Sequence, residues 1–537
     1  LMNPRRAAPI FFTVSCLLAA FLYAAFFANF AATLSDWSGF GFTWTQQMFH
    51  NFLHGRPFQS SLFATLAAGR SVGFSANPHA FIHADVIHVN FTPYLFAWLW
   101  ALHPTPSSIY VLIFAWNLGA GAWFASSILR RRTRPDGRGR LLVALGVLAF
   151  AGLLSVLCQM AQMLLFAGPL LLAAYDAYLA RRRGLFLLWI AALALVSEDA
   201  AMVGVCFGAH LFLIEDEGRP YGLGAAAVCF SYLVFLLFVV QPAARAELTL
   251  TGSTTTAVIA KKLFALKGGP LMDNLRSMAP LLPFVPVFFL AAGLFGVPDR
   301  RGLMRAGSLA LLPALPHWGE CVVVGGAHHL LPPWYGLFLA LLSWLRDAPG
   351  PSPRAARWTW AAASAFFLVS LRVQAGHLPL RLKPALYRLA GKPDKAASLE
   401  RSLAGEGASN RAVIAAVSTL SNERSLVFLG NNRVSGFIAG RPEIWDFPQY
   451  HDRADYLLIQ KDAIDANYSA HPEERDQPVA AATVNELRRT LAGTHRAALE
   501  NDHVLLLERV RKTPFENPPT TYGWGWTRNI GRRPPRG

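Results

Sequence analysis

Carboxylates and imidazoles lie beside long apolar stretches at widely separated positions of the sequence. Ionisable groups close to lipid carry a high free-energy cost, so each needs a structural or a functional reason. Such side chains can transfer protons, and they can bind metal ions. The residues concerned all fall at the predicted outer ends of apolar stretches or in the long segment after the first stretch. They are Asp36, Asp85, His88, Glu198, Asp199, Glu320, His328, His329 and Tyr335.

Each of these residues also has an ordinary structural interpretation. Asp36, and the pair Glu198 and Asp199, could cap helices, where acidic side chains interact favourably with the N-terminal dipole. His328 and His329 could be interfacial residues with ordinary hydrogen bonds. Three residues of the long segment could hold a metal ion, although a loop spacing suits a solvated or structural role as well: His83, Asp85 and His88.

The composition indicates an integral membrane protein. Of 537 residues, 53% are hydrophobic and only 15% are charged, whereas soluble domains carry about 25% charged residues. The mean hydropathy is +0.33. A water-soluble core could not cover that much apolar surface, so lipid must cover part of it. The 15 tryptophans suit residues stationed at membrane interfaces.

The sequence contains about eleven stretches that could cross a bilayer, each approaching the roughly 20 apolar residues that a spanning helix needs. They predict a polytopic α-helical membrane protein. Five cysteines lie within or beside these stretches without metal-ligand spacing, and they imply no disulfide framework. The candidate spans lie near 8–33, 107–128, 141–157, 159–180, 184–197, 199–214, 221–240, 277–296, 303–316, 331–346 and 356–374.

Arginine placement predicts the orientation of the spans. The net charge is +17, yet no basic face with interleaved aromatic residues indicates nucleic-acid binding. The arginines instead cluster in short loops, as cytoplasmic loops do. We expect a multi-pass protein of the plasma (inner) membrane with Arg5 and Arg6 in the cytoplasm. The other cytoplasmic loops are 129–140, 181–183, 215–220, 297–302 and 347–355, of which only 215–220, Glu-Asp-Glu-Gly-Arg-Pro, is not rich in arginine.

This orientation places three segments on the non-cytoplasmic side. Two of them belong to a transmembrane domain of residues 1–375: a first outer loop at 35–106 and a segment at 241–276. The latter contains an amphipathic stretch whose lysines could extend to lipid phosphates. The third segment, 376–511, alternates apolar runs at 426–429, 456–459 and 504–507 with helix-compatible stretches at 408–420 and 482–493. It predicts a small periplasmic or extracellular α/β domain, followed by an irregular tail at 512–537.

Several motifs, taken in order, resemble a family of uncharacterised polytopic membrane proteins. Residues 46–58 read Gln-Gln-Met-Phe-His-Asn-Phe-Leu-His-Gly-Arg-Pro-Phe, and residues 90–93 read Asn-Phe-Thr-Pro. Glu-Asp-Ala follows at 198–200. The C-terminal part contains Arg441-Pro442-Glu443, Phe447-Pro448 and, at 454–458, Ala-Asp-Tyr-Leu-Leu. The motifs extend over most of the chain, and their order is more specific than any one of them.

That family is similar to the GT-C superfamily of membrane glycosyltransferases. The resemblance implies many helices, a first outer loop with a catalytic carboxylate, and an outer C-terminal domain. It also implies transfer of a sugar from a polyprenyl-phosphate carrier to an acceptor on the non-cytoplasmic face. The sequence departs from the family pattern at Gly41 and Gln46, where the family has aspartates, and at Asn90, where it has histidine.

These departures leave two functions open. In an enzyme, the nearest replacement carboxylates are Asp36 and Asp85, either of which could take the acceptor's proton. The alternative is a catalytically degenerate member that acts as a structural or assembly subunit of a membrane complex. A secondary transporter is disfavoured, because no repeated halves are found and the charges lie at the ends of spans.

The chemistry of glycosyl transfer suggests substrate-binding roles for the remaining polar residues. Positive charge or a metal must stabilise the leaving phosphate, and a carboxylate pair could hold a divalent cation such as Mg or Mn. No other cofactor is expected. The candidate substrate-binding residues are Arg56, Arg70, Glu198, Asp199, Lys261, Lys262, His328, His329 and Tyr335.

Overall fold

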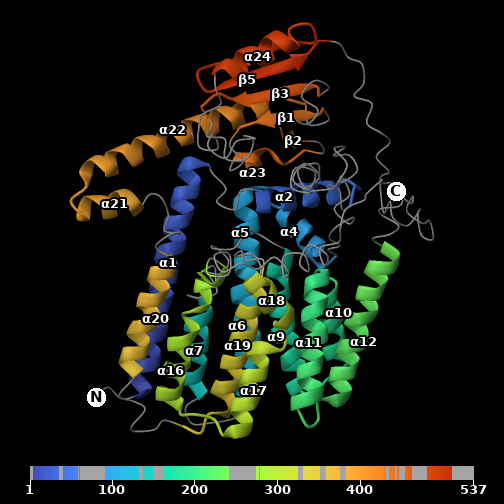
Figure 1. The fold of residues 1–537 in the computed structure, drawn as a ribbon, viewed down its shortest axis with the longest axis vertical. Helices are drawn as coiled ribbons and strands as arrows, with labels where there is room; N and C mark the ends of the chain where they lie inside the picture. The colour runs from blue at the N-terminus through green and yellow to red at the C-terminus, as the bar shows by residue number, and fades with distance from the viewer. Residues whose placement is uncertain are drawn as a thin grey trace.

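The structure is a computed structural model in which a bundle of helices carries a small sheet domain at one end (Figure 1). We call this end of the bundle the outer end and the opposite end the inner end. The description covers residues 4–34, 40–57, 60, 91–131, 137–149, 163–240, 272, 274–276, 278–323, 330–350, 359–374, 382–421, 424–430, 434–441, 444–446, 454–462 and 481–510.

Helices lie within every stretch that was predicted to cross the membrane. Among the residues that the structure describes, four helical segments are long and apolar enough to do so by length and composition: Arg6–Ala25, Pro106–Arg130, Arg219–Val240 and Asn274–Phe295. The bundle elements are α1 (Pro4–Thr33), α5 (Pro106–Ala115), the π-helix η4 (Trp116–Ala120), α6 (Gly121–Arg130), α7 (Gly137–Val147), the 3₁₀ helix η6 (Met163–Phe166), α9 (Ala167–Leu179), α10 (Arg183–Ala194), α11 (Glu198–Ile214), α12 (Arg219–Phe235), η7 (Leu236–Val240), η8 (Ala279–Leu281), α16 (Phe284–Phe295), α17 (Arg300–Leu311), α18 (Leu315–Val323), α19 (Leu331–Asp347) and α20 (Thr359–Gln374).

The centre of the bundle is formed by α9 and α19, whose residues are buried almost all round. Helices at the periphery expose large apolar side chains instead, such as Phe238 and Trp123, which are 74% and 73% exposed. A soluble protein rarely exposes apolar surface on this scale, so lipid must cover it. The protein is therefore a mostly helical membrane protein.

Part of the predicted first outer loop is helical. It contains α2 (Phe40–Leu53), the 3₁₀ helix η3 (Thr92–Phe96) and α4 (Ala97–Trp100). The buried side of α2 packs on the other two: the Phe52 ring stacks on Tyr94 at 4.6 Å, and Phe49 meets Trp100 at 6.2 Å. These four aromatic residues therefore pack the described part of this loop together over the outer end of the bundle.

The C-terminal part contains a five-stranded mixed sheet of order β2-β1-β3-β5-β4. The first three strands in this order are parallel, and β5 pairs antiparallel to β3 and β4. The predicted apolar runs are strands β1, β3 and β5, whereas β2 and β4 were not predicted. The elements are α21 (Leu382–Leu389), α22 (Pro393–Ser418), β1 (Leu426–Leu429), α23 (Ser435–Ile438), β2 (Ile444–Asp446), β3 (Tyr456–Gln460), α24 (Ala481–Leu491), β4 (His495–Glu500) and β5 (Val504–Arg509).

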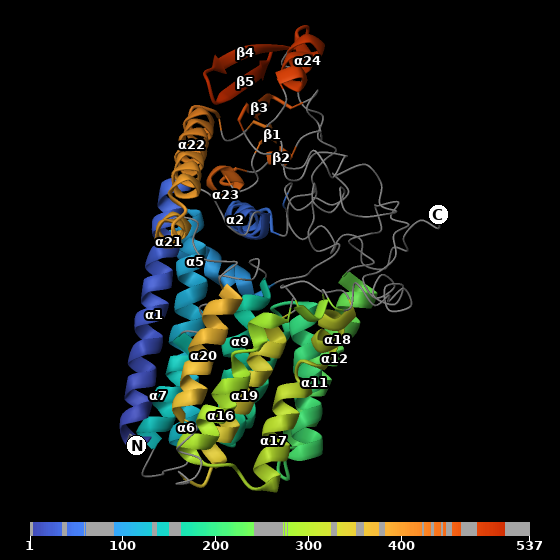
Figure 2. The same ribbon diagram turned by 60° about the vertical axis from the view of Figure 1, so that its left-hand side comes forward.

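The long helix α22 joins this domain to the outer end of α1 (Figures 1 and 2). The buried Asn410 side chain donates from Nδ2 to the Thr33 carbonyl at 2.8 Å, so it satisfies a carbonyl that the end of a helix leaves open. Its Oδ1 accepts from Gln460 Nε2 at 2.9 Å, at the end of β3. Leu34 follows with a φ of +49°, which is uncommon for leucine. These contacts fix where the chain leaves the first span.

Candidate functional site

Basic and imidazole side chains gather where α2 meets the C-terminal domain, a group that we call the outer basic cluster: His50, His54, Arg56 and Arg441. The His50 and His54 rings stack at 4.2 Å. Arg441, just after α23, is only 1% exposed. Its guanidinium donates to the Arg424 carbonyl at 3.5 Å, and its own carbonyl accepts from Gln47 Nε2 at 3.3 Å. The contact thus joins the first outer loop to the small domain.

The electrostatics of the outer basic cluster favour an anion. Burial, together with repulsion from His54, Arg56 and Arg441, lowers the pKa of His50 to about 4. Burial also lowers the pKa of the Arg441 guanidinium to about 10. Several positive groups therefore act on one partly buried region, and a phosphate placed there would relieve their mutual repulsion.

Acidification is expected to weaken the packing of α2, with His50 as the cause. The imidazole pKa is about 4 in the folded protein against 6.5 ordinarily, so the unfolded chain takes up a proton first. The stability from the neutral imidazole is complete above about pH 6.5 and is lost as the pH falls toward 4, on the order of 2 kcal/mol for a partly buried group. Thermal unfolding across this range should show a smaller loss in His50→Gln than in the wild type. The exposed His54 provides the control variant His54→Gln, and an equal loss in wild type and His50→Gln would contradict the assignment.

The structure brings together two motifs that lie about 100 residues apart in sequence. The Phe91 and Thr92 amides donate to the Leu195 carbonyl at 2.8 and 3.0 Å, and Thr92 Oγ1 donates to the Ala192 carbonyl at 2.8 Å. This clamp holds the end of the first outer loop against the turn before α11. Glu198, the first residue of α11, follows that turn.

Glu198 and Asp199 lie in the first turn of α11, where acidic side chains favour the helix dipole. The N-cap is Ser197, whose Oγ accepts from the Ala200 amide at 3.1 Å. Both residues are partly exposed, although Glu198 Oε2 is buried, and Glu198 interacts electrostatically with the Tyr232 hydroxyl of α12. A carboxylate thus stands at the outer end of the bundle beside the clamped loop.

Tyr335 lies in the interior of the bundle. Its hydroxyl donates to Asn117 Oδ1 in η4, and the side chain is 5% exposed. The ring fills the space beside Gly168 of α9, where a Cβ atom would fall only 1.7 Å from the Tyr335 ring. Tyr335 therefore packs α19 against α9 and η4.

Most other predicted site residues lie outside the described residues: Asp36, Asp85, Arg70, Lys261, Lys262, His328 and His329, together with His83, His88 and Asn90. Of the departures from the family pattern, Gln46 lies in α2 and is 2% exposed.

Of the outer basic cluster, only Arg56 was predicted. His50 and Arg441 were missed, although both lie within motifs that the sequence displays.

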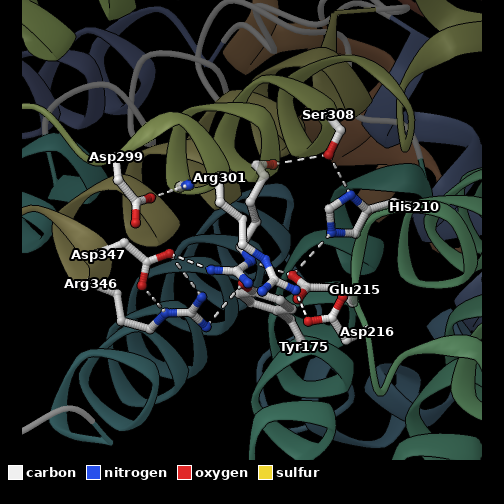
Figure 3. Close-up of polar contacts among 11 residues, drawn as sticks. Tyr175, His210, Glu215, Asp216, Asp299, Arg301, Ser308, Arg346 and Asp347 are labelled. Atoms are coloured by element: carbon white, nitrogen blue, oxygen red, sulfur yellow. Dashed lines mark hydrogen bonds and ion pairs between the residues drawn. The ribbon is translucent and has the colours of Figure 1, made fainter.

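Sequence reasoning also missed an ion network at the inner end of the bundle (Figure 3). Arg305 of α17 bridges Glu215 and Asp347, with N–O distances of 2.6 Å to each. Arg346 binds Asp347 at 3.1 Å and donates to the Tyr175 hydroxyl at 3.2 Å. The network lies beside a cavity of about 740 Å³ whose lining includes Glu215, Arg305 and Asp347.

This network explains why the loop at 215–220 is acidic among arginine-rich loops. Glu215 pairs with Arg305, Asp216 with Arg301, and Glu217 with Arg181. The loop therefore supplies counter-charges to arginines of two neighbouring segments. The loop at 215–220, whose sequence did not help to predict the orientation, thus stabilises the inner end of the bundle through ion pairs.

The predicted Mg or Mn site stays a prediction. Within the described ranges, no group of three or more His, Cys, Asp or Glu side chains could hold a metal ion. The segment with the predicted ligands His83, Asp85 and His88 lies outside those ranges.

Comparisons with known proteins identify the family of the chain. Residues 37–492 match a family model described as "Predicted membrane protein (DUF2079)". No curated protein matches the sequence. Among solved structures, a crystal structure of ArnT from Cupriavidus metallidurans bound to undecaprenyl phosphate is similar, with a TM-score of 0.46 and 12% identity. The similarity covers 94% of this chain and 98% of that one.

Proposed function

The chain belongs to the DUF2079 family of predicted membrane proteins, and we propose that it is a glycosyltransferase. It would move a sugar from a polyprenyl-phosphate carrier to an acceptor on the non-cytoplasmic face. The proposal includes an inner-membrane location, about eleven spans as the sequence suggests, and an N-terminus in the cytoplasm. It also includes the division into residues 1–375, 376–511 and 512–537, with the small domain outside.

The observation that carries the proposal is the outer basic cluster. The Arg56 and Arg441 guanidiniums, beside the neutral His50 imidazole, create a positive, partly buried region at the outer end of an apolar bundle. A lipid-linked sugar leaves its phosphate behind when the glycosidic bond to the carrier breaks, and fixed positive charge stabilises the negative charge that develops there. The lipid-exposed helices below the cluster could accommodate the polyprenyl chain.

The acceptor side of the reaction needs a base. Glu198 places a carboxylate at the outer end of the bundle. The hydrogen bonds of Phe91 and Thr92 to the turn before α11 hold the first outer loop beside it. Asp36 and Asp85 remain our candidates for the proton acceptor. Asn410 supports Asp36 as a candidate, because it binds the carbonyls of Thr33 and Leu34 and so fixes the chain up to two residues before that carboxylate.

Loss of Arg441 is expected to slow sugar transfer from the polyprenyl-phosphate carrier strongly. We expect Arg441→Gln and Arg56→Gln to lower transfer from a labelled polyprenyl-phosphate sugar in proteoliposomes by about 100-fold. Both variants should also retain less undecaprenyl phosphate on purification, as measured by mass spectrometry. Arg424→Gln is the matched control, because its side chain pairs with Glu508 at the surface of the small domain.

Three outcomes would count against this assignment. Wild-type transfer in Arg441→Gln would remove the outer basic cluster from the mechanism. An equal loss in Arg424→Gln would indicate damage to the small domain instead. Separate Asp36→Asn and Asp85→Asn variants test the base, and full activity in both would exclude these two carboxylates.

One observation favours the second candidate, a structural or assembly subunit of a membrane complex. Gln46, at the position of a family aspartate, is buried in α2 and only 2% exposed. A neutral, buried side chain suits packing better than proton transfer. Stable co-purification with a complex, without turnover of any lipid-linked sugar, would support this candidate over the enzyme.

A further inference from the structure

A groove runs along one face of α6 toward the arginine-rich inner end. It has a volume of about 720 Å³. The residues that line the groove, listed below, recur at intervals of three and four along the sequence, so they form one stripe on the helix surface. The stripe is roughly 18 Å long at 1.5 Å per residue, close to the half-thickness of a hydrocarbon core of about 30 Å. The lining residues are Gly119, Ala122, Trp123, Ser126, Ser127, Arg130 and Arg131.

The inner end of the groove carries a positive charge. Arg131 is engaged with the Asp176 carboxylate at 2.8 and 2.9 Å. Arg130 is exposed, and within the described part of the chain it forms no ion pair or hydrogen bond. One turn deeper, Ser126 and Ser127 place hydroxyls in the groove. Ser126 donates its hydroxyl proton to the Ala122 carbonyl at 2.6 Å, and Ser127 Oγ accepts from Arg131 at 3.4 Å. A phosphodiester at this depth would therefore find the exposed Arg130 guanidinium as its cation, with the Ser127 hydroxyl proton as a further donor.

The deeper part of the groove is apolar and spacious. A Cβ atom added at Gly119 would meet no atom within 4 Å. Trp123, between this space and the serines, is 73% exposed, and tryptophan is enriched near membrane interfaces. A hydrocarbon chain could therefore follow the helix past Ala122 and Gly119 while its headgroup stays at Arg130.

We propose that this groove binds an anionic phosphoglyceride of the leaflet at the inner end. Arg130 holds the phosphodiester, and an acyl chain lies along Ala122 and Gly119. Basic sites on membrane helices near the cytoplasmic surface are typical of anionic-lipid recognition. The groove lies at the opposite end from the outer basic cluster, so the inference stands apart from the proposed glycosyl transfer.

The test uses the full chain in nanodiscs that contain phosphatidylcholine and phosphatidylglycerol. Native mass spectrometry after detergent extraction counts the lipids that each variant retains. We expect the wild type to retain phosphatidylglycerol in preference, and Arg130→Gln to retain about fivefold less. Gly119→Leu should lose the bound lipid without any change of charge. The matched controls are Arg300→Gln, an exposed arginine at the same end, and Gly307→Leu, a second glycine whose Cβ would meet open space.

Several results would overturn the inference. Wild-type retention in Arg130→Gln or in Gly119→Leu would exclude the groove, and an equal loss in Arg300→Gln would indicate diffuse surface charge. Displacement of the lipid by inorganic phosphate would indicate a site for free phosphate. A dimer that separates in Gly119→Leu would show that a second copy of the chain occupies the groove.

Discussion

Replacing Arg305 by leucine is expected to destabilise the folded protein by about 3–5 kcal/mol, because buried carboxylates then lose their cation. Arg305 is 16% exposed, and its partners Glu215 and Asp347 are each 6% exposed. Asp347 retains Arg346, so Glu215 carries most of the loss. The measurement is the temperature at which half of the detergent-solubilised protein stays monodisperse.

Two companion variants make this result specific. Arg301→Leu removes an exposed pair, since Arg301 and Asp216 are 57% and 72% exposed, and it should cost no more than about 1 kcal/mol. In Arg305→Leu, Glu215 keeps only the His210 imidazole, at 3.8 Å, among its described partners. Neutralising this carboxylate with Glu215→Gln should restore part of the stability. If Arg301→Leu were as harmful as Arg305→Leu, the burial of the network would not be the cause.

Leucine at Gly407 is expected to separate the C-terminal domain from the first span. A Cβ atom at this position would lie 2.5 Å from the Ala32 carbonyl oxygen, a backbone atom that cannot turn aside. The helices α22 and α1 would have to move apart, at about 1–3 kcal/mol for the overpacking alone. The movement would also break the bond from Asn410 to the Thr33 carbonyl.

Limited proteolysis reads out this separation, as faster release of a C-terminal fragment. Gly405→Leu is the matched control, because it lies on the same helix with open space around its Cβ position. Asn410→Ala should produce a milder release, since it removes the buried hydrogen bonds to the Thr33 carbonyl and from Gln460 without introducing a clash. Equal release from Gly405→Leu and Gly407→Leu would mean that helix α22 itself is damaged.

The helices of the bundle could be predicted because lipid imposes a simple rule on them. A helix that faces hydrocarbon must be apolar over most of its length, and such runs stand out in any sequence. The same logic failed for α2, which lies over the bundle and buries polar side chains, among them Gln46, Gln47 and Asn51. Its Met48 and Phe49 are buried, but they stand among polar neighbours that resemble a loop.

The sheet was predicted only where its strands are buried. β1 and β3 are buried along their whole length, and their apolar runs identified them. β4 exposes every residue after His495, so it presents no such run, and its pairing with β5 depends on contacts that sequence does not display.

The candidate site was predicted in part because its motifs were visible but their partners were not. Thr92 and Glu198 were both noted, and the structure places the end of the first outer loop against the turn before Glu198. Arg441 lies hundreds of residues from His50, and only the docking of the small domain brings the two together. The ion network at the inner end was missed for the same reason. The acidic loop at 215–220 pairs with arginines that are distant in sequence, and only the structure shows these pairs.

The acidic turn between α11 and α12 has a consequence for biosynthesis. Glu215 acquires its partner Arg305 only after 90 further residues have been made. At translation rates of about 5–20 residues per second, the nascent hairpin waits on the order of ten seconds for that cation. During this interval Glu217 already has its partner Arg181, and Glu215 has the His210 imidazole at 3.8 Å but not yet its arginine. The hairpin therefore enters the membrane early but becomes locked in place late, when α17 leaves the ribosome.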